Sequence, residues 1–376
     1  FGKKSVERNN KVIMNKRNEQ IDVMRGIGIL LMVYGHCCRA NSVIALFHMS
    51  LFFVISGYCF NDDNCGSIRK VYAYFKRKVK SLWVPYFFFT SLFLIGTNIF
   101  IKVGIYTNDP SILTIKNSMI DKIHHYLGIK ECVKMFVMEF FFQTETQLGG
   151  ALWFLQCLFF SSVLFALTTG LLQKIFQSIH VREFMLVIIS VASLLLGYYC
   201  SINSIWIKGF NRVFSCFWIL TFGQLIKRHD IMRQYKNELA FAALGMLIIL
   251  DRYGKISLVA NEYPNPVFLV GCSILGWFMV YGASNMILAK CAFCGNILQY
   301  IGRHSISIIG LHFLSFKIIT FLIMHIRNYP HIYLATFPVI YDYVWVIPYM
   351  ILGIGLPLLA GRISIRCKLK IREVLK

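Results

Sequence analysis

The sequence predicts an all-α, polytopic integral membrane protein with about ten transmembrane helices. Of its 376 residues, 57% are hydrophobic and only 15% are charged, whereas soluble domains are about 45–50% apolar and about 25% charged. A soluble fold of this length needs a polar shell that this composition cannot supply. The apolar residues also fall in blocks long enough to cross a bilayer, which takes about 20 residues of helix.

Ten apolar blocks separated by polar segments mark the predicted spans. They cover residues 21–40, 43–60, 82–102, 150–172, 183–200, 211–226, 238–251, 266–289, 304–326 and 342–361. The first two form a hairpin that turns around Ala40-Asn41-Ser42. Because no internal repeat or linker interrupts the chain, we expect one transmembrane domain over 21–361, between a basic tail at 1–20 and another at 362–376.

The positive charges indicate how these spans are oriented. With the N-terminus in the cytoplasm, 26 of the 39 lysine and arginine residues fall in cytoplasmic segments. The positive-inside rule predicts this bias for a chain with both termini in the cytoplasm. Since the basic residues cluster beside the spans, orientation and contact with anionic lipid explain the net charge of +22 better than nucleic-acid binding does.

Two other features of the sequence point to structure and not to chemistry. The longest segment between spans, 103–149, is amphipathic at Cys132–Phe142, and we expect this stretch to lie along the outer interface of the membrane. Cys291 and Cys294 have the spacing of metal ligands, but no second pair or histidine set accompanies them. We therefore expect no metal site.

The first span carries the strongest candidates for chemistry. An arginine inside a span is costly and marks function unless it reaches the interface. Arg25 and His36 are eleven residues apart, which puts both on one helix face about 16 Å apart along the axis. Asp22 precedes Arg25 by three residues and can pair with it. Taken singly, Arg25 could set topology and His36 could pack between helices, but together they favour a functional site.

Further motifs follow along the chain in a fixed order. They are Phe47–Tyr58, Phe75–Tyr86, Leu152–Leu155, Phe214–Gly223 and Leu298–His312. Together with Arg25 and His36 they resemble the membrane acyltransferase 3 family, and they are most similar to its fucose 4-O-acetylase-like proteins. The resemblance extends from about residue 20 to 360.

The resemblance implies an O-acyltransferase of the bacterial cytoplasmic membrane. It would move an acetyl or other short acyl group from cytosolic acyl-CoA to a hydroxyl of an envelope glycan or lipid-linked sugar. Acetyl-CoA is then a co-substrate, and no bound cofactor is expected. A sugar hydroxyl needs a base, and imidazole titrates nearest to working pH. His36 is therefore the expected base, with an acyl-His36 intermediate as the alternative, and Arg25 is expected to hold or polarise the thioester.

Other residues are expected to support these two. Lys76, Arg77 and Lys80 are expected to bind the phosphates of the donor, although topology alone also accounts for this basic cluster. The residues expected near the acceptor or in supporting roles are Asp22, His48, Ser56, Tyr58, Trp153 and His312. For His48, Trp153 and His312, roles in packing or at the membrane interface stay open.

Two other classes of protein compete with this interpretation. A transporter or flippase for a lipid-linked sugar is the main alternative, and such proteins often have internal repeats and interrupted helices. The sequence shows neither feature. A non-catalytic scaffold or sensor is the third class, and it would leave Arg25 and His36 without a shared purpose.

Overall fold

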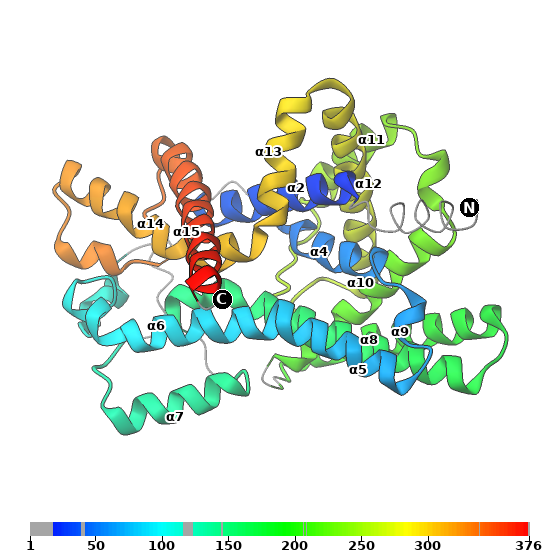
Figure 1. Cartoon of the computed structure of the whole chain (residues 1–376). Coiled ribbons are helices and arrows are strands. Elements are labelled where there is room, and N and C mark those ends of the chain that lie inside the picture. Colours follow the sequence, from blue (N-terminus) through cyan, green and yellow to red (C-terminus); the bar gives the residue numbers. More distant parts are fainter. Residues whose placement is uncertain are drawn as a thin grey trace.

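The described part of the chain is helical throughout (Figure 1). The computed structural model describes residues 18–38, 42–115, 123–143, 146–205, 207, 209–337 and 339–374, with side chains up to 363. Most of the expected N-terminal tail, and residues 39–41 of the expected hairpin turn, lie outside these ranges. The helices are α2 (Glu19–Cys37), α3 (Ser42–Ala45), α4 (His48–Tyr58), α5 (Ile68–Lys78), α6 (Val84–Lys102), α7 (Ile129–Phe140), α8 (Trp153–Ile175), α9 (Ile179–Ile202), α10 (Phe210–Arg228), α11 (Glu238–Leu250), α12 (Pro266–Lys290), α13 (Ala292–Arg303), α14 (Ser305–Ile326) and α15 (Val346–Val374).

Each of the ten predicted spans coincides with a helix, and α3 and α4 share the second span. Within the described ranges, six helical segments are long and apolar enough to cross a membrane. They are Ile68–Lys102, Gln147–Ile175, Ile179–Ile202, Pro266–Lys290, Ser305–Ile326 and Tyr343–Ile363. Ser42–Tyr58 and α11 are apolar but shorter, and α2 and α10, which contain the buried charges Asp22 and Arg212, are not among the six. The chain is thus a multi-pass membrane protein.

The third span is longer than the sequence predicts. Its helix begins at Ile68, not near residue 82, and passes through a π-helical turn at Val79–Trp83 into α6. Pro85 lacks an N–H and its ring crowds the carbonyl four residues earlier, which disturbs the α-helical ladder at this point. The N–H of Val84 bonds instead to the carbonyl of Val79, five residues back.

Helix α7 is the predicted amphipathic helix. It lies along α6 and runs antiparallel to it (Figure 1). Just before it starts, Leu127 exchanges two hydrogen bonds with Asn98 of α6, at 2.8 and 3.0 Å. At its end, Trp83 Nε1 donates to the carbonyl of Phe140 at 3.3 Å. Its location at the outer interface of the membrane stays a prediction.

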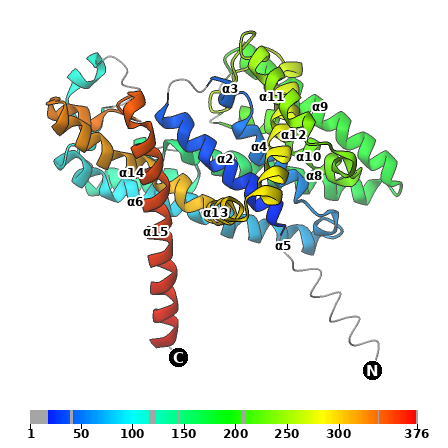
Figure 2. The ribbon, with the colours of Figure 1, turned by 90° about the horizontal axis from the view of Figure 1, so that it is seen from above.

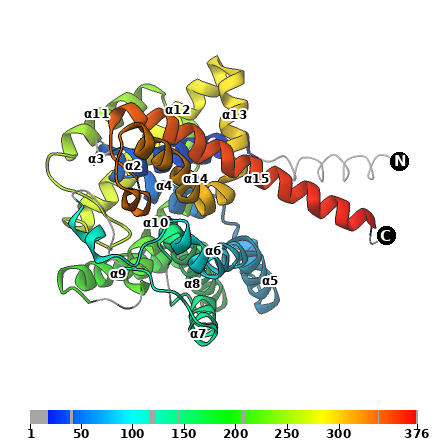
Figure 3. The ribbon, with the colours of Figure 1, turned by 90° about the vertical axis from the view of Figure 1, so that its left-hand side faces the viewer.

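The helices form two groups with the functional residues between them. Helices α5 to α8 lie on one side, and α2 and α11 to α15 lie on the other (Figure 3). Helix α15 extends beyond the rest of the molecule, so the expected C-terminal tail begins as helix (Figure 2). A Cβ at Gly26 would lie 2.2 Å from the Leu298 carbonyl oxygen, and one at Gly302 would lie 2.0 Å from that of Asp22. These glycines let α2 and α13 touch backbone to backbone.

Candidate active site

Two cavities lie along α2, one at each of the residues that the sequence singles out. Arg25 lines a cavity of about 500 Å³, the inner cavity. His36 lines a cavity of about 170 Å³, the outer cavity. Phe52, Phe154 and Ile309 line both. Because eleven residues of helix rise about 16 Å, the two cavities approach this shared apolar wall from opposite ends of α2.

Cationic side chains line the inner cavity, namely Arg25, Lys78 and Arg303. Asp22 is only 1% exposed, and its carboxylate lies 3.5 Å from Arg25 Nη1 and 2.9 Å from Arg303 Nε. The predicted pairing of Asp22 with Arg25 is therefore present, with a second arginine added from α13. A buried carboxylate between two guanidinium groups holds both in place through charge-assisted hydrogen bonds.

Lys78 brings a third cation to the inner cavity. Its Nζ lies 3.4 Å from the hydroxyl of Ser56, which also lines the cavity, and 5.3 Å from the ring centre of Tyr74. His304 lines the same cavity from the junction of α13 and α14. The inner cavity can therefore receive an anionic or strongly polar ligand.

The three basic residues predicted to bind donor phosphates lie outside the lining of the inner cavity. Lys76 Nζ lies 4.7 Å from the ring centre of Tyr72. Arg77 donates to Asn64 Oδ1 at 2.5 Å. Lys80 belongs to the π-helical turn that follows α5. The helical register of α5 thus turns Lys78, and not these neighbours, towards Arg25.

Three histidines meet at the outer cavity. His36 and His48 line it, and the ring centre of His312 lies 5.3 Å from that of His36. The Nδ1 atoms of His48 and His312 lie 2.8 and 2.9 Å from the main-chain carbonyls of Ile44 and Ile308. Because a carbonyl oxygen only accepts, both Nδ1 atoms carry a proton, and Nε2 of each ring is the nitrogen left to exchange a proton. The outer cavity therefore offers imidazole nitrogens, and the described residues that line it include no lysine, arginine or carboxylate.

Arg212 connects two parts of the lining of the outer cavity. It is 2% exposed, and its guanidinium lies 5.0 Å from the ring centre of Trp153, which lines the cavity. Its Nη1 donates to the carbonyl of Val259 at 3.0 Å, and Nε donates to that of Gly209 at 3.1 Å. The segment 256–259 also lines the cavity. Arg212 thus links this segment, through a hydrogen bond, to Trp153, through a cation–π contact.

The structure brings most predicted site residues to the two cavities and adds others. Among the supporting residues, Ser56, His48 and Trp153 line a cavity. Asp22 and His312 line neither cavity but contact Arg25 and His36, which do. The ring of Tyr58 packs 5.4 Å from that of Trp277 and lines neither cavity. The sequence reasoning gave no role to Lys78, Arg212, Arg303 or His304. A charge within a span was the signal for Arg212, and Arg303 and His304 lie inside the quoted motif Leu298–His312.

The helices define a multi-pass membrane protein with two adjoining cavities, and the family comparison gives its class. The model of the acyltransferase 3 family, described as an acyltransferase domain, matches residues 18–361. The chain therefore belongs to this family and is a membrane acyltransferase. Searches of curated proteins and of solved structures found no match.

Proposed function

We propose that this acyltransferase is an O-acetyltransferase of the bacterial cytoplasmic membrane, with both termini in the cytoplasm. It moves acetyl, or another short acyl group, from cytosolic acyl-CoA to a hydroxyl of an envelope glycan or lipid-linked sugar. The observation that carries the proposal is the pair of cavities, one lined by cations and one by histidines, with a thin apolar wall between them. A cationic cavity suits a polyanionic donor, and a cavity with imidazoles suits an uncharged polyol. The similarity to fucose 4-O-acetylase-like proteins favours a sugar acceptor.

In the proposed reaction, His36 removes the proton from the acceptor hydroxyl as its oxygen attacks the thioester carbonyl carbon. Arg25 lies about 16 Å from His36 along α2, too far to contact the same carbonyl group, and instead holds the phosphopantetheine of the donor. The carbon–sulfur bond then breaks, the acyl group stays on the acceptor oxygen, and the CoA sulfur takes up a proton. For the two substrates to meet, the wall of Phe52, Phe154 and Ile309 must open between the cavities. An acyl-His36 intermediate is the second route for the same transfer.

The test uses membranes that contain the protein and its native glycans. Radiolabelled acetyl-CoA is added, and label in glycan is compared between the wild type, His36→Ala and His325→Ala. His325 is an exposed histidine on α14 and serves as the matched control. We expect label with the wild type and the control, and a loss of about 10²–10⁴-fold in rate with His36→Ala.

Each other outcome removes a different part of the proposal. Full labelling by His36→Ala, at equal protein abundance, would show that the base is another residue. If the wild type labels no glycan, acetyl-CoA is the wrong donor. Movement of a lipid-linked sugar across the membrane without any labelling would instead support the transporter alternative.

A further inference from the structure

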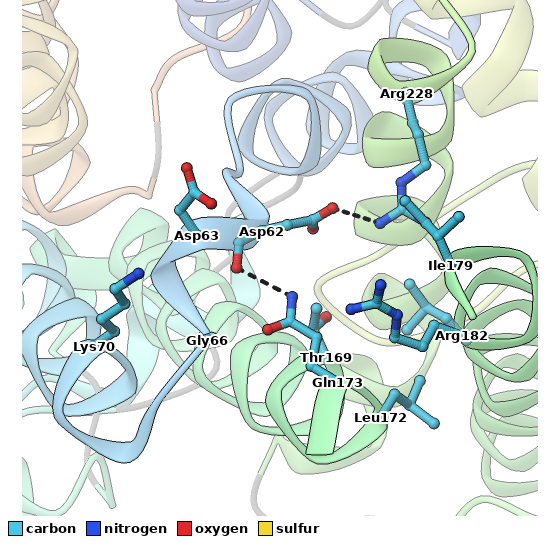
Figure 4. Close-up of a pocket in the computed structure, with 11 residues that line it drawn as sticks. Asp62, Asp63, Gly66, Lys70, Thr169, Leu172, Gln173, Ile179, Arg182 and Arg228 are labelled. Atoms are coloured by element: carbon cyan, nitrogen blue, oxygen red, sulfur yellow. Dashed lines mark hydrogen bonds and ion pairs between the residues drawn. The ribbon is translucent and has the colours of Figure 1, made fainter. Parts of the chain in front are cut away.

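A third cavity, which we name the α9 pocket, lies apart from the two cavities of the candidate active site. Its volume is about 260 Å³, and it lies between α5, α8, α9, α10 and the turn before α5 (Figure 4). None of the residues that line it lines the inner or the outer cavity. The turn at Asp62–Asn64 belongs to a segment that the charge distribution assigns to the cytoplasm.

Two carboxylates beside the α9 pocket, Asp62 and Glu183, already accept hydrogen bonds from neighbouring side chains. Asp62 accepts from Arg228 at 2.7 Å (Figure 4), and it also accepts from the side-chain amide of Gln224. Glu183 accepts from the same Arg228 at 3.2 Å. Asp63 is exposed at the rim. Asp62 is therefore paired within the pocket, and Glu183 lies outside its lining.

Two hydrogen-bond donors in the α9 pocket, by contrast, have no partner among the described residues. The Arg182 guanidinium points towards Thr169 (Figure 4), and its Nε is buried without a hydrogen-bond partner among the described residues. Thr169 is only 5% exposed, and its hydroxyl also lacks a partner in this part of the chain. Lys70 approaches from the opposite side, where its Nζ lies 3.7 Å from the position of a Cβ on Gly66. Because an unpaired buried donor is costly, these groups favour a ligand that accepts.

Helix α9 adds its N-terminus to the same pocket. The helix has 24 residues, the side chain of Ser178 makes no capping hydrogen bond, and Ile179 in the first turn lines the pocket. The first N–H groups of such a helix have no partner within it and carry the positive end of its dipole. Helix N-termini, arginine and threonine are the groups that bind phosphate in proteins. We propose that the α9 pocket binds a phosphate ester.

The face of α5 points to the source of this phosphate. Lys70, Tyr74 and Lys78 recur every four residues and so share one face, over about 12 Å from the first to the last. Lys70 lines the α9 pocket, whereas Tyr74 and Lys78 line the inner cavity. A ligand that follows this face has its acyl end near Arg25 and its phosphate end near Arg182. The phosphate would then belong to the nucleotide end of acyl-CoA, and this assignment rests on the proposed function. The headgroup of an anionic lipid carries the same phosphate chemistry.

The test compares Arg182→Gln and Lys70→Gln with Arg233→Gln in purified protein reconstituted in nanodiscs. Arg233 is exposed outside the pocket and is the matched control. With acetyl-CoA as donor, we expect each pocket variant to raise KM about tenfold or more with kcat unchanged, as loss of a charge-assisted bond predicts. With S-acetylpantetheine, which has no phosphate, the variants and the wild type should share one KM.

Calorimetry and thermal unfolding complete the test. CoA titrated by calorimetry should bind each pocket variant about tenfold more weakly than the control. If CoA affinity is unchanged but phosphatidylglycerol no longer stabilises the variants relative to phosphatidylcholine, the pocket binds a lipid headgroup. If neither measurement changes, the phosphate site is overturned. If the wild type transfers acetyl from neither donor, the proposed function fails, while CoA titration still decides the pocket.

Discussion

The inner and outer cavities hold their polar side chains in place by different interactions. In the inner cavity the groups are charged, and Asp22 holds Arg25 and Arg303 by ion pairs. In the outer cavity they are imidazole rings, and His48 and His312 are oriented by main-chain carbonyls. A buried charge needs an opposite charge, whereas an imidazole can be held by hydrogen bonds alone. In the proposed reaction, the fixed charge serves the donor and the imidazole nitrogens serve the acceptor.

The largest expected effect concerns binding of the donor on the charged side. Arg25→Gln should lower kcat/KM for acetyl-CoA by about 10²-fold, because it removes charge-assisted hydrogen bonds to the donor. Arg303→Gln is the matched variant, since Arg303 lines the same cavity and shares Asp22. Steady-state transfer from acetyl-CoA measures both. An equal loss of kcat/KM in the two variants would mean that the cavity needs positive charge in general and that Arg25 has no special position.

The second effect concerns the stability of the ion-paired network. Asp22→Asn leaves two guanidinium groups without their shared carboxylate, and because Asp22 is buried and both arginines are partly exposed we expect destabilisation of about 2 kcal/mol. Thermal unfolding in detergent measures it. A double-mutant cycle with Arg303→Gln should give a clear coupling energy. Additive effects in that cycle would show that the contact between α2 and α13 holds without the ion pair.

Much of the inner and outer geometry follows from the sequence, because membrane helices require long apolar runs and a helix has a known period. Those two rules predict the helix that carries Arg25 and His36 and the face that they share. The pairing of Arg303 with Asp22 could not be predicted, since it joins positions 281 residues apart. It depends on the close approach of α2 and α13 at Gly26 and Gly302, which is a tertiary feature.

The basic segment before α6 also has a feature that depends on the fold and could not be predicted from composition. Its composition predicts that cations gather on the cytoplasmic side, but composition does not choose among Lys76, Arg77, Lys78 and Lys80. The choice depends on helix α5 beginning at Ile68 and on the π-helical turn that follows it. Neither was predicted, because a helix of strongly polar residues has no apolar run to mark it.

The third effect belongs to the outer cavity and separates acceptor from donor. Trp153→Leu removes the ring held by Arg212 and should raise KM for the acceptor glycan about tenfold, with KM for acetyl-CoA unchanged. Trp83→Leu is the matched control, since Trp83 stacks on Phe87 outside both cavities. The two KM values are measured by varying one substrate at a time. A rise in the acetyl-CoA KM instead would mean that the two cavities do not serve separate substrates.

The last effect compares Asp22 with a second buried carboxyl group. Glu139 of α7 is fully buried, and no ion pair within the described ranges involves it. Burial raises the pKa of Glu139 to about 7, and the facing Ser91 hydroxyl only partly opposes this shift. Because the folded protein holds the proton more tightly than the unfolded chain, the favourable contribution is complete below about pH 4.5 and is lost as pH rises through about 7.

Glu139→Gln should therefore remove the loss of stability that accompanies a rise in pH. Relative to the wild type, we expect the variant to gain about 2–3 kcal/mol of stability on going from pH 5 to pH 8, since most of the shift from 4.5 to about 7 is expressed between these pH values and one unit corresponds to about 1.4 kcal/mol. Thermal unfolding at the two pH values measures the gain. Glu131→Gln, on the exposed face of the same helix, should show no such difference. An equal pH dependence in the wild type and Glu139→Gln would mean that the pKa of Glu139 is the same in the folded and the unfolded chain.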